Sequence, residues 1–97
     1  MITFLQLLAR DPKNLLARRD LGSAYVETGE YAKARAAFQQ VLTMAPDDYV
    51  SNYEIGFVED RLGLLKEAKE HLETACRASP ESQQARKELE AVEAKLK

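Results

Sequence analysis

The only imidazole and the only thiol of the chain lie close together, at His71 and Cys76. Such a pair acts as base and nucleophile when the two side chains meet. On a helix, five residues correspond to about 500° of rotation, so these side chains would point about 140° apart. Cys76 falls on an apolar stripe and is expected to be an unreactive core thiol. His71 lies among glutamates, so we expect it on a solvent-facing surface.

The sequence gives little support for a metal site or a phosphate-binding site. One His and one Cys cannot supply the ligand clusters of zinc sites or a hydrolytic triad. The glycines are spaced too widely for a phosphate-binding loop. We therefore expect no catalytic, metal or cofactor-binding residues, no cofactor, and no enzyme activity.

The charge balance and the lengths of the apolar segments argue against nucleic-acid binding and membrane insertion. The 97 residues include 14 Lys and Arg and 16 Asp and Glu, which gives a net charge of −2. Nucleic-acid binding usually needs a basic surface, and a membrane span needs about 18 apolar residues in a row. No basic stretch precedes the apolar N-terminus, as a signal peptide would require. We expect a cytoplasmic protein with no nucleic-acid or membrane partner. The acidic pair Glu59 and Asp60 and the charged run 66–73 are expected to face solvent.

The turn-forming residues repeat at a fixed interval of 34. Three prolines, two pairs of glycines and three helix-capping residues share it, and a period of this size is typical of stacked helical units. The equivalent sets are Pro12, Pro46 and Pro80; Gly22 and Gly56; Gly29 and Gly63; and Asn14, Asp48 and Ser82.

Between these turns, apolar residues recur at helical spacing. A polar cap begins each unit, a glycine separates its two helices and a proline ends it. No segment reads as a strand. The expected helices cover about 2–10, 15–28, 31–44, 49–62, 65–78 and 83–96.

The pattern resembles the tetratricopeptide repeat, whose signature is W-x2-L-G-x2-Y, then A-x3-F, then P within 34 residues. The resemblance implies an all-α, α-α superhelix of six antiparallel helices in a single domain, 1–97. That domain comprises an N-terminal half-repeat (1–13), repeat 1 (14–47), repeat 2 (48–81) and a C-terminal capping helix (82–97). The matching residues are Leu21, Gly22, Tyr25, Ala34, Phe38 and Pro46 in the first unit, and Ile55, Gly56, Ala68, Leu72 and Pro80 in the second.

Several positions depart from the signature. Arg18 and Asn52 stand at the Trp position, and Glu59 replaces the second Tyr. Glu90 stands where Gly22 and Gly56 stand in the earlier units. A glycine there allows close approach of a neighbouring helix, so Glu90 is consistent with a capping helix that faces water.

The resemblance also implies a function: the first helices of successive repeats line a concave groove that receives a peptide or a helix. We therefore expect a non-catalytic protein–protein interaction module, or scaffold. Tyr53 and Phe57 share one face of their helix, and two interpretations stay open, a binding surface or packing against neighbouring helices. The candidate protein- or peptide-binding residues are Leu16, Arg19, Ser23, Val26, Val50, Tyr53, Phe57, Asp60, Arg61 and Lys87.

Some members of the family clamp the carboxylates of Hsp70 and Hsp90 C-terminal tails. Of the corresponding positions, only Arg19 carries a positive charge, and Glu54 and Glu88 would repel a carboxylate. The sequence therefore predicts that the chaperone tails are not partners. The five corresponding positions are Arg19, Ser23, Glu54, Gln84 and Glu88.

The N-terminal half-repeat suggests an alternative function. Its short helix is apolar nearly all round, and exposed apolar patches of this kind mark protein contacts. Assembly through self-association, as a homodimer, is therefore possible, and so is a tilted helix that buries most of this surface. The candidate self-association residues are Ile2, Phe4, Leu5 and Leu8.

Overall fold

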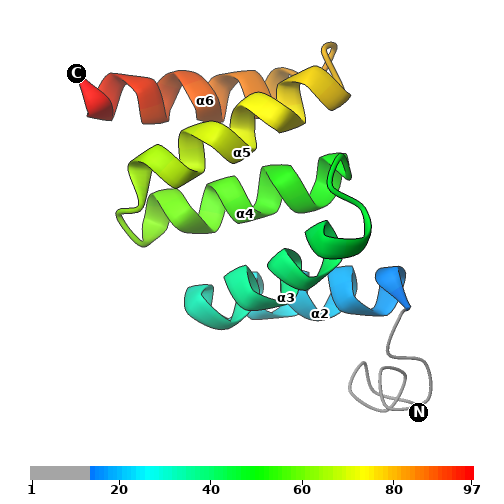
Figure 1. Ribbon diagram of the computed structural model, residues 1–97. Helices are drawn as coiled ribbons and strands as arrows, with labels where there is room; N and C mark the ends of the chain where they lie inside the picture. The colour runs from blue at the N-terminus through cyan, green and yellow to red at the C-terminus, as the bar shows by residue number, and fades with distance from the viewer. Residues whose placement is uncertain (1–13) are drawn as a thin grey trace.

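The computed structural model describes residues 14–97, which form five helices stacked in chain order (Figure 1). They are α2 (Leu15–Glu27), α3 (Tyr31–Met44), α4 (Tyr49–Arg61), α5 (Leu65–Ala78) and α6 (Gln83–Leu96). The all-α prediction is confirmed, and each of these helices ends within a residue of its expected range. None of the five is long and apolar enough to cross a membrane. The expected helix 2–10 lies outside the described residues.

Side-chain caps fix where α2, α4 and α6 begin. Asn14, Asp48 and Ser82 each accept a hydrogen bond from the backbone N–H three residues later. Such a bond satisfies one of the donors that the first turn of a helix leaves without a partner. Between paired helices, Gly29 and Gly63 adopt φ of 79° and 80°, a region that other residues avoid. The residues that recur every 34 positions in the sequence therefore mark the helix boundaries.

The remaining two glycines allow the helices within a repeat to approach closely. A Cβ on Gly22 would lie 2.7 Å from the ring of Phe38, and a Cβ on Gly56 would lie 2.6 Å from Leu72. These contacts join α2 to α3 and α4 to α5. The large side chain of the second helix thus occupies the space beside the glycine of the first.

The stack curves toward one side. Each helix packs against the next, and α4 also contacts both α2 and α6. By contrast, no Cα of α3 comes within 8 Å of a Cα of α5. Alternate helices are therefore closest together on the α2, α4 and α6 side. We call the surface formed by these three helices the inner face.

Two buried apolar clusters hold the stack together. The first joins α3 to α4, and the second joins α5 to α6. Tyr53 packs against the second and Phe57 against the first, so α4 contributes to both. The clusters consist of Ala34, Phe38, Ile55 and Val58, and of Ala68, Leu72 and Val92.

Gly22→Ala should destabilise the domain. The added methyl group overlaps the Phe38 ring, and overpacking of this kind costs about 1–3 kcal/mol. The better helix propensity of alanine returns only about 1 kcal/mol. Urea unfolding should show a lower midpoint for the variant.

Glu90→Ala is the matched control, because Glu90 occupies the equivalent position one repeat beyond Gly56 and is exposed. It should leave the midpoint nearly unchanged. Equal midpoints for Gly22→Ala and the wild-type protein would show that the helix pair tolerates a Cβ here.

Candidate functional site

The predicted binding residues fall on α2, α4 and α6, the helices of the inner face, but their exposure differs widely. Leu16, Arg61 and Lys87 are exposed, whereas Asp60 is buried. The other six, which are Arg19, Ser23, Val26, Val50, Tyr53 and Phe57, are half-buried.

Tyr53 lies between the core and the inner face. Its ring stacks on that of Tyr49, with centroids 6.1 Å apart and planes 16° apart. The Tyr49 hydroxyl forms a hydrogen bond with Ser82, the cap of α6. Burial, together with the carboxylates of Glu88 and Glu54, raises the pKa of Tyr53. The two tyrosines therefore form an aromatic surface where α4 meets α6.

Phe57 occupies a similar boundary position one turn further along α4. Its ring meets that of Tyr31 edge-on, with centroids 6.4 Å apart. The guanidinium of Arg61 lies 4.5 Å from its centroid, within the range of a cation–π contact. Tyr53 and Phe57 thus combine the two interpretations left open by the sequence: each packs on the core and each keeps part of its surface exposed.

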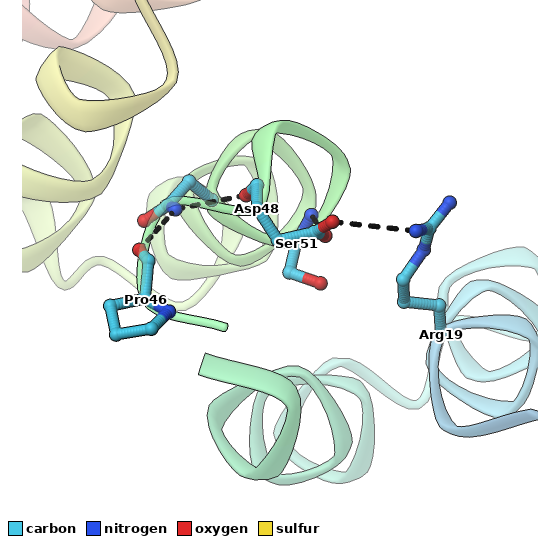
Figure 2. A network of polar contacts seen from close by, with 5 residues as sticks. Arg19, Pro46, Asp48 and Ser51 are labelled. Atoms are coloured by element: carbon cyan, nitrogen blue, oxygen red, sulfur yellow. Dashed lines mark hydrogen bonds and ion pairs between the residues drawn. The ribbon is translucent and has the colours of Figure 1, made fainter. Parts of the chain in front are cut away.

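Arg19 is tied to the next repeat. One oxygen of Asp48 accepts from the backbone N–H of Ser51 at 2.9 Å, which caps α4. The other oxygen binds Arg19 Nη1 at 3.3 Å (Figure 2). Beside this link, Arg19 Nε and Ser51 Oγ are buried and have no hydrogen-bond partner among the described residues. The helix cap therefore also orients Arg19 on the inner face.

The structure buries the acidic pair that the sequence predicted to face solvent, so that expectation is wrong. Asp60 keeps only 1% of its side chain exposed, and its two oxygens bind Lys95 Nζ at 2.7 Å and Arg61 Nη1 at 3.2 Å. Burial alone would raise the pKa of Asp60, but Lys95, the neighbouring Glu88 and Arg61 together hold it below its usual value. Because its oxygens are already engaged, Asp60 is better placed to position Arg61 and Lys95 than to contact a ligand itself.

Glu59 is the other buried carboxylate, and it explains His71. Its side chain is fully buried, with one oxygen 2.9 Å from Arg35 Nε and the other 2.6 Å from His71 Nδ1. His71 is therefore not a solvent-facing histidine, as the sequence suggested, but a half-buried partner of Glu59. Glu59 stands at the position of the second signature Tyr. That position was the one indication in the sequence that this residue belongs to the core. The three side chains connect α3, α4 and α5.

Cys76 is a free, half-buried thiol. Burial raises its pKa, and a raised pKa reduces the thiolate on which reactivity depends. Within residues 14–97, no group of three or more His, Cys, Asp and Glu could hold a metal ion. Ile2, Phe4, Leu5 and Leu8 lie outside the described residues, so self-association through them stays a prediction.

Glu54 and Glu88 are the two carboxyl groups expected to repel an acidic tail. Burial raises the pKa of Glu54. Burial and the neighbouring Asp60 raise the pKa of Glu88, and Glu88 Oε1 has no hydrogen-bond partner within residues 14–97. A raised pKa means that the charged form is disfavoured. Both groups are therefore weaker sources of negative charge than ordinary surface glutamates.

Glu59→Ala should lower the free energy of unfolding by about 2–3 kcal/mol, because it leaves Arg35 and His71 beside a cavity without their shared carboxylate. Urea denaturation at pH 7 measures the change. Glu70→Ala, at an exposed position of α5, is the control and should have little effect. A similar loss in both variants would show that the buried contacts of Glu59 contribute no specific stability.

Glu54→Gln should stabilise the domain at pH 7 but not at pH 4. The folded-state pKa of Glu54 lies above its ordinary value. Its contribution to stability is therefore fully present below pH 4 to 4.5 and is lost as the pH rises through the folded-state pKa. Thermal unfolding at both pH values tests this, with Glu70→Gln as the control. A gain of equal size at pH 4 would contradict the assignment.

Solved structures share this architecture. The first TPR of Spaghetti (RPAP3) bound to the HSP90 peptide SRMEEVD has a TM-score of 0.93 at 22% identity, over 96% of this chain and 74% of that one. The second TPR domain of human RPAP3, in complex with the HSP70 peptide SGPTIEEVD, has a TM-score of 0.87 at 26% identity, over 93% and 75%. The Sgt2 TPR domain from Aspergillus fumigatus has a TM-score of 0.89 at 22% identity, over 96% and 63%.

Two of these domains correct one expectation. The sequence argument excluded Hsp70 and Hsp90 tails, yet both RPAP3 domains share this fold and hold HSP90 and HSP70 peptides. The exclusion is therefore wrong. It treated Glu54 and Glu88 as fully charged, whereas their surroundings disfavour the charged form.

Sequence comparisons point the same way. Tetratricopeptide repeat protein 16 of Macaca fascicularis is 29% identical over a 70-residue alignment that covers 65% of this chain. Tetratricopeptide repeat protein 37 of Xenopus laevis is 36% identical over 61 residues, which are 63% of this chain. The chain spans 8% and 4% of the lengths of these two curated relatives. Models of the tetratricopeptide repeat match residues 3–49 and 49–82, and this protein belongs to the tetratricopeptide repeat family.

Proposed function

We propose that this domain is a non-catalytic interaction module whose inner face binds an extended peptide or a helix of another protein. The observation that carries the proposal is the pair of half-exposed aromatic side chains, Tyr53 and Phe57, in the middle helix of that face. Aromatic residues that are held rigidly and remain partly exposed are typical centres of binding energy at protein interfaces.

The surroundings of the two aromatic residues suit a peptide. Leu16 is 61% exposed at one end of the inner face, and Lys87 is exposed on α6. An apolar centre with polar and charged groups around it is the usual composition of a protein interface. The peptide-holding RPAP3 domains, which share this fold, support the same assignment.

The test is a peptide-display selection against the wild-type domain, followed by fluorescence polarisation with the selected peptides. SRMEEVD and SGPTIEEVD belong in the panel, because domains of this fold hold them. Tyr53→Ala combined with Phe57→Ala should weaken binding at least about tenfold, the equivalent of 1.4 kcal/mol.

Both aromatic residues also pack on the core, so a second variant separates binding from folding. Leu16→Ser changes an exposed side chain of the inner face and should weaken binding while far-UV helicity stays unchanged. Met44→Ser is its control, because Met44 is 41% exposed on α3, away from the inner face. Peptides that bind the Leu16 and Met44 variants as tightly as the wild-type protein, or a selection that yields no binding peptide, would contradict the proposal.

A further inference from the structure

Arg61 is held in place by two neighbours at the C-terminal end of α4. Its Nη1 donates to the buried carboxylate of Asp60 at 3.2 Å, and its guanidinium lies over the ring of Phe57 at 4.5 Å. Asp60 is itself fixed by Lys95 of α6 at 2.7 Å. An exposed arginine normally samples many rotamers, and a ligand must offset the entropy lost on ordering it. Here the contacts within the domain already restrict the side chain.

Most donors of Arg61 nevertheless remain available. A guanidinium carries five N–H groups in a rigid fork, and only Nη1 is hydrogen-bonded to a described residue. The side chain is 44% exposed. The fork matches the two oxygens of a carboxylate, with which arginine forms paired, charge-assisted hydrogen bonds.

The local charge balance selects the kind of anion. Four ionisable groups gather here: the cations Arg61 and Lys95, and the carboxyl groups of Asp60 and Glu88. Burial of Glu88 disfavours its charged form. Asp60 offsets one of the two cations. A carboxylate brings a single negative charge to this site, whereas a doubly charged phosphate would bring two beside the carboxyl groups of Asp60 and Glu88.

We propose that Arg61 is a carboxylate-binding residue of the inner face, and that the bound peptide places an Asp, a Glu or its C-terminal carboxylate on this guanidinium. Asp60 and Phe57 act as positioning residues. This inference rests on the proposed function and names the chemistry of its ligand. Arg61 is not among the five positions that correspond to the chaperone-tail clamp of the family, so it adds a contact of its own.

The test uses a small probe and does not require the natural peptide. N-acetylglutamate N-methylamide is titrated at constant ionic strength, and NMR follows the arginine Nε–Hε signals. The Arg61 signal should shift and saturate, and the accompanying shift at the Phe57 amide should disappear in Arg61→Gln. Arg77, an exposed arginine at the end of α5, is the internal control, and the uncharged glutamine analogue is the chemical control.

Three results would overturn the inference: equal, non-saturating shifts at Arg61 and Arg77; an equal response to the glutamine analogue; or a stronger response to inorganic phosphate. Asp60→Asn tests the positioning role, because it should weaken the Arg61 response while Arg61 itself is retained. An unchanged response would assign that role to Phe57 alone.

The outcome is separable from that of the proposed function. A saturating Arg61 response in a domain that binds no displayed peptide would reject the proposed function and retain the carboxylate contact. Peptide binding that is lost with Leu16→Ser, without any Arg61 response, would retain the proposed function and reject the carboxylate contact.

Discussion

The close contact between a glycine and a large side chain 16 residues later is the constraint on which the rest of this structure depends. Gly22 meets Phe38, and Gly56 meets Leu72. These contacts bring the two helices of each repeat together more closely than any side chain at the glycine position would allow. The spacing within each pair then determines how α4 meets α2 and α6, and so forms the inner face. Glu90, at the equivalent position one repeat further along, is exposed.

α4 differs from its equivalent α2 in how it contributes to the interior. Besides Ile55 and Val58, it buries four polar residues: Ser51, Asn52, Glu59 and Asp60. Asn52 donates to the backbone oxygens of Pro46 and Asp48. Buried polar groups require specific partners, because an unpaired one costs more than an apolar contact gains. The bonds of Asn52 hold α4 to the turn that precedes it. The contacts of Glu59 and Asp60 with Arg35, His71 and Lys95 fix the register of α4 against α3, α5 and α6.

The sequence predicted the helices almost to the residue, because caps, glycines and prolines act locally and repeat at one interval. It failed for Glu59, Asp60 and His71, whose surroundings are made by distant residues. Arg35 lies 24 positions before Glu59, and Lys95 lies 35 positions after Asp60. Reading charges along a single helix assigns them to solvent, since no local signal shows which neighbouring helix supplies a counter-ion. The prediction that excluded the chaperone tails failed for a related reason. Residue type alone does not show whether burial disfavours the charged form of a carboxyl group.

The buried carboxylates also link the core to the surface. Asp60 binds one cation from its own helix and one from α6, and Asp48 caps α4 while it holds Arg19 of α2. In each case a carboxylate that stabilises the helix stack orients a cation on the inner face. Because the same contacts determine how the helices are spaced and where the cations point, a change in the stack would move the charges of the inner face with it. The geometry of this surface is therefore a property of the helix packing as a whole and not of the exposed residues alone.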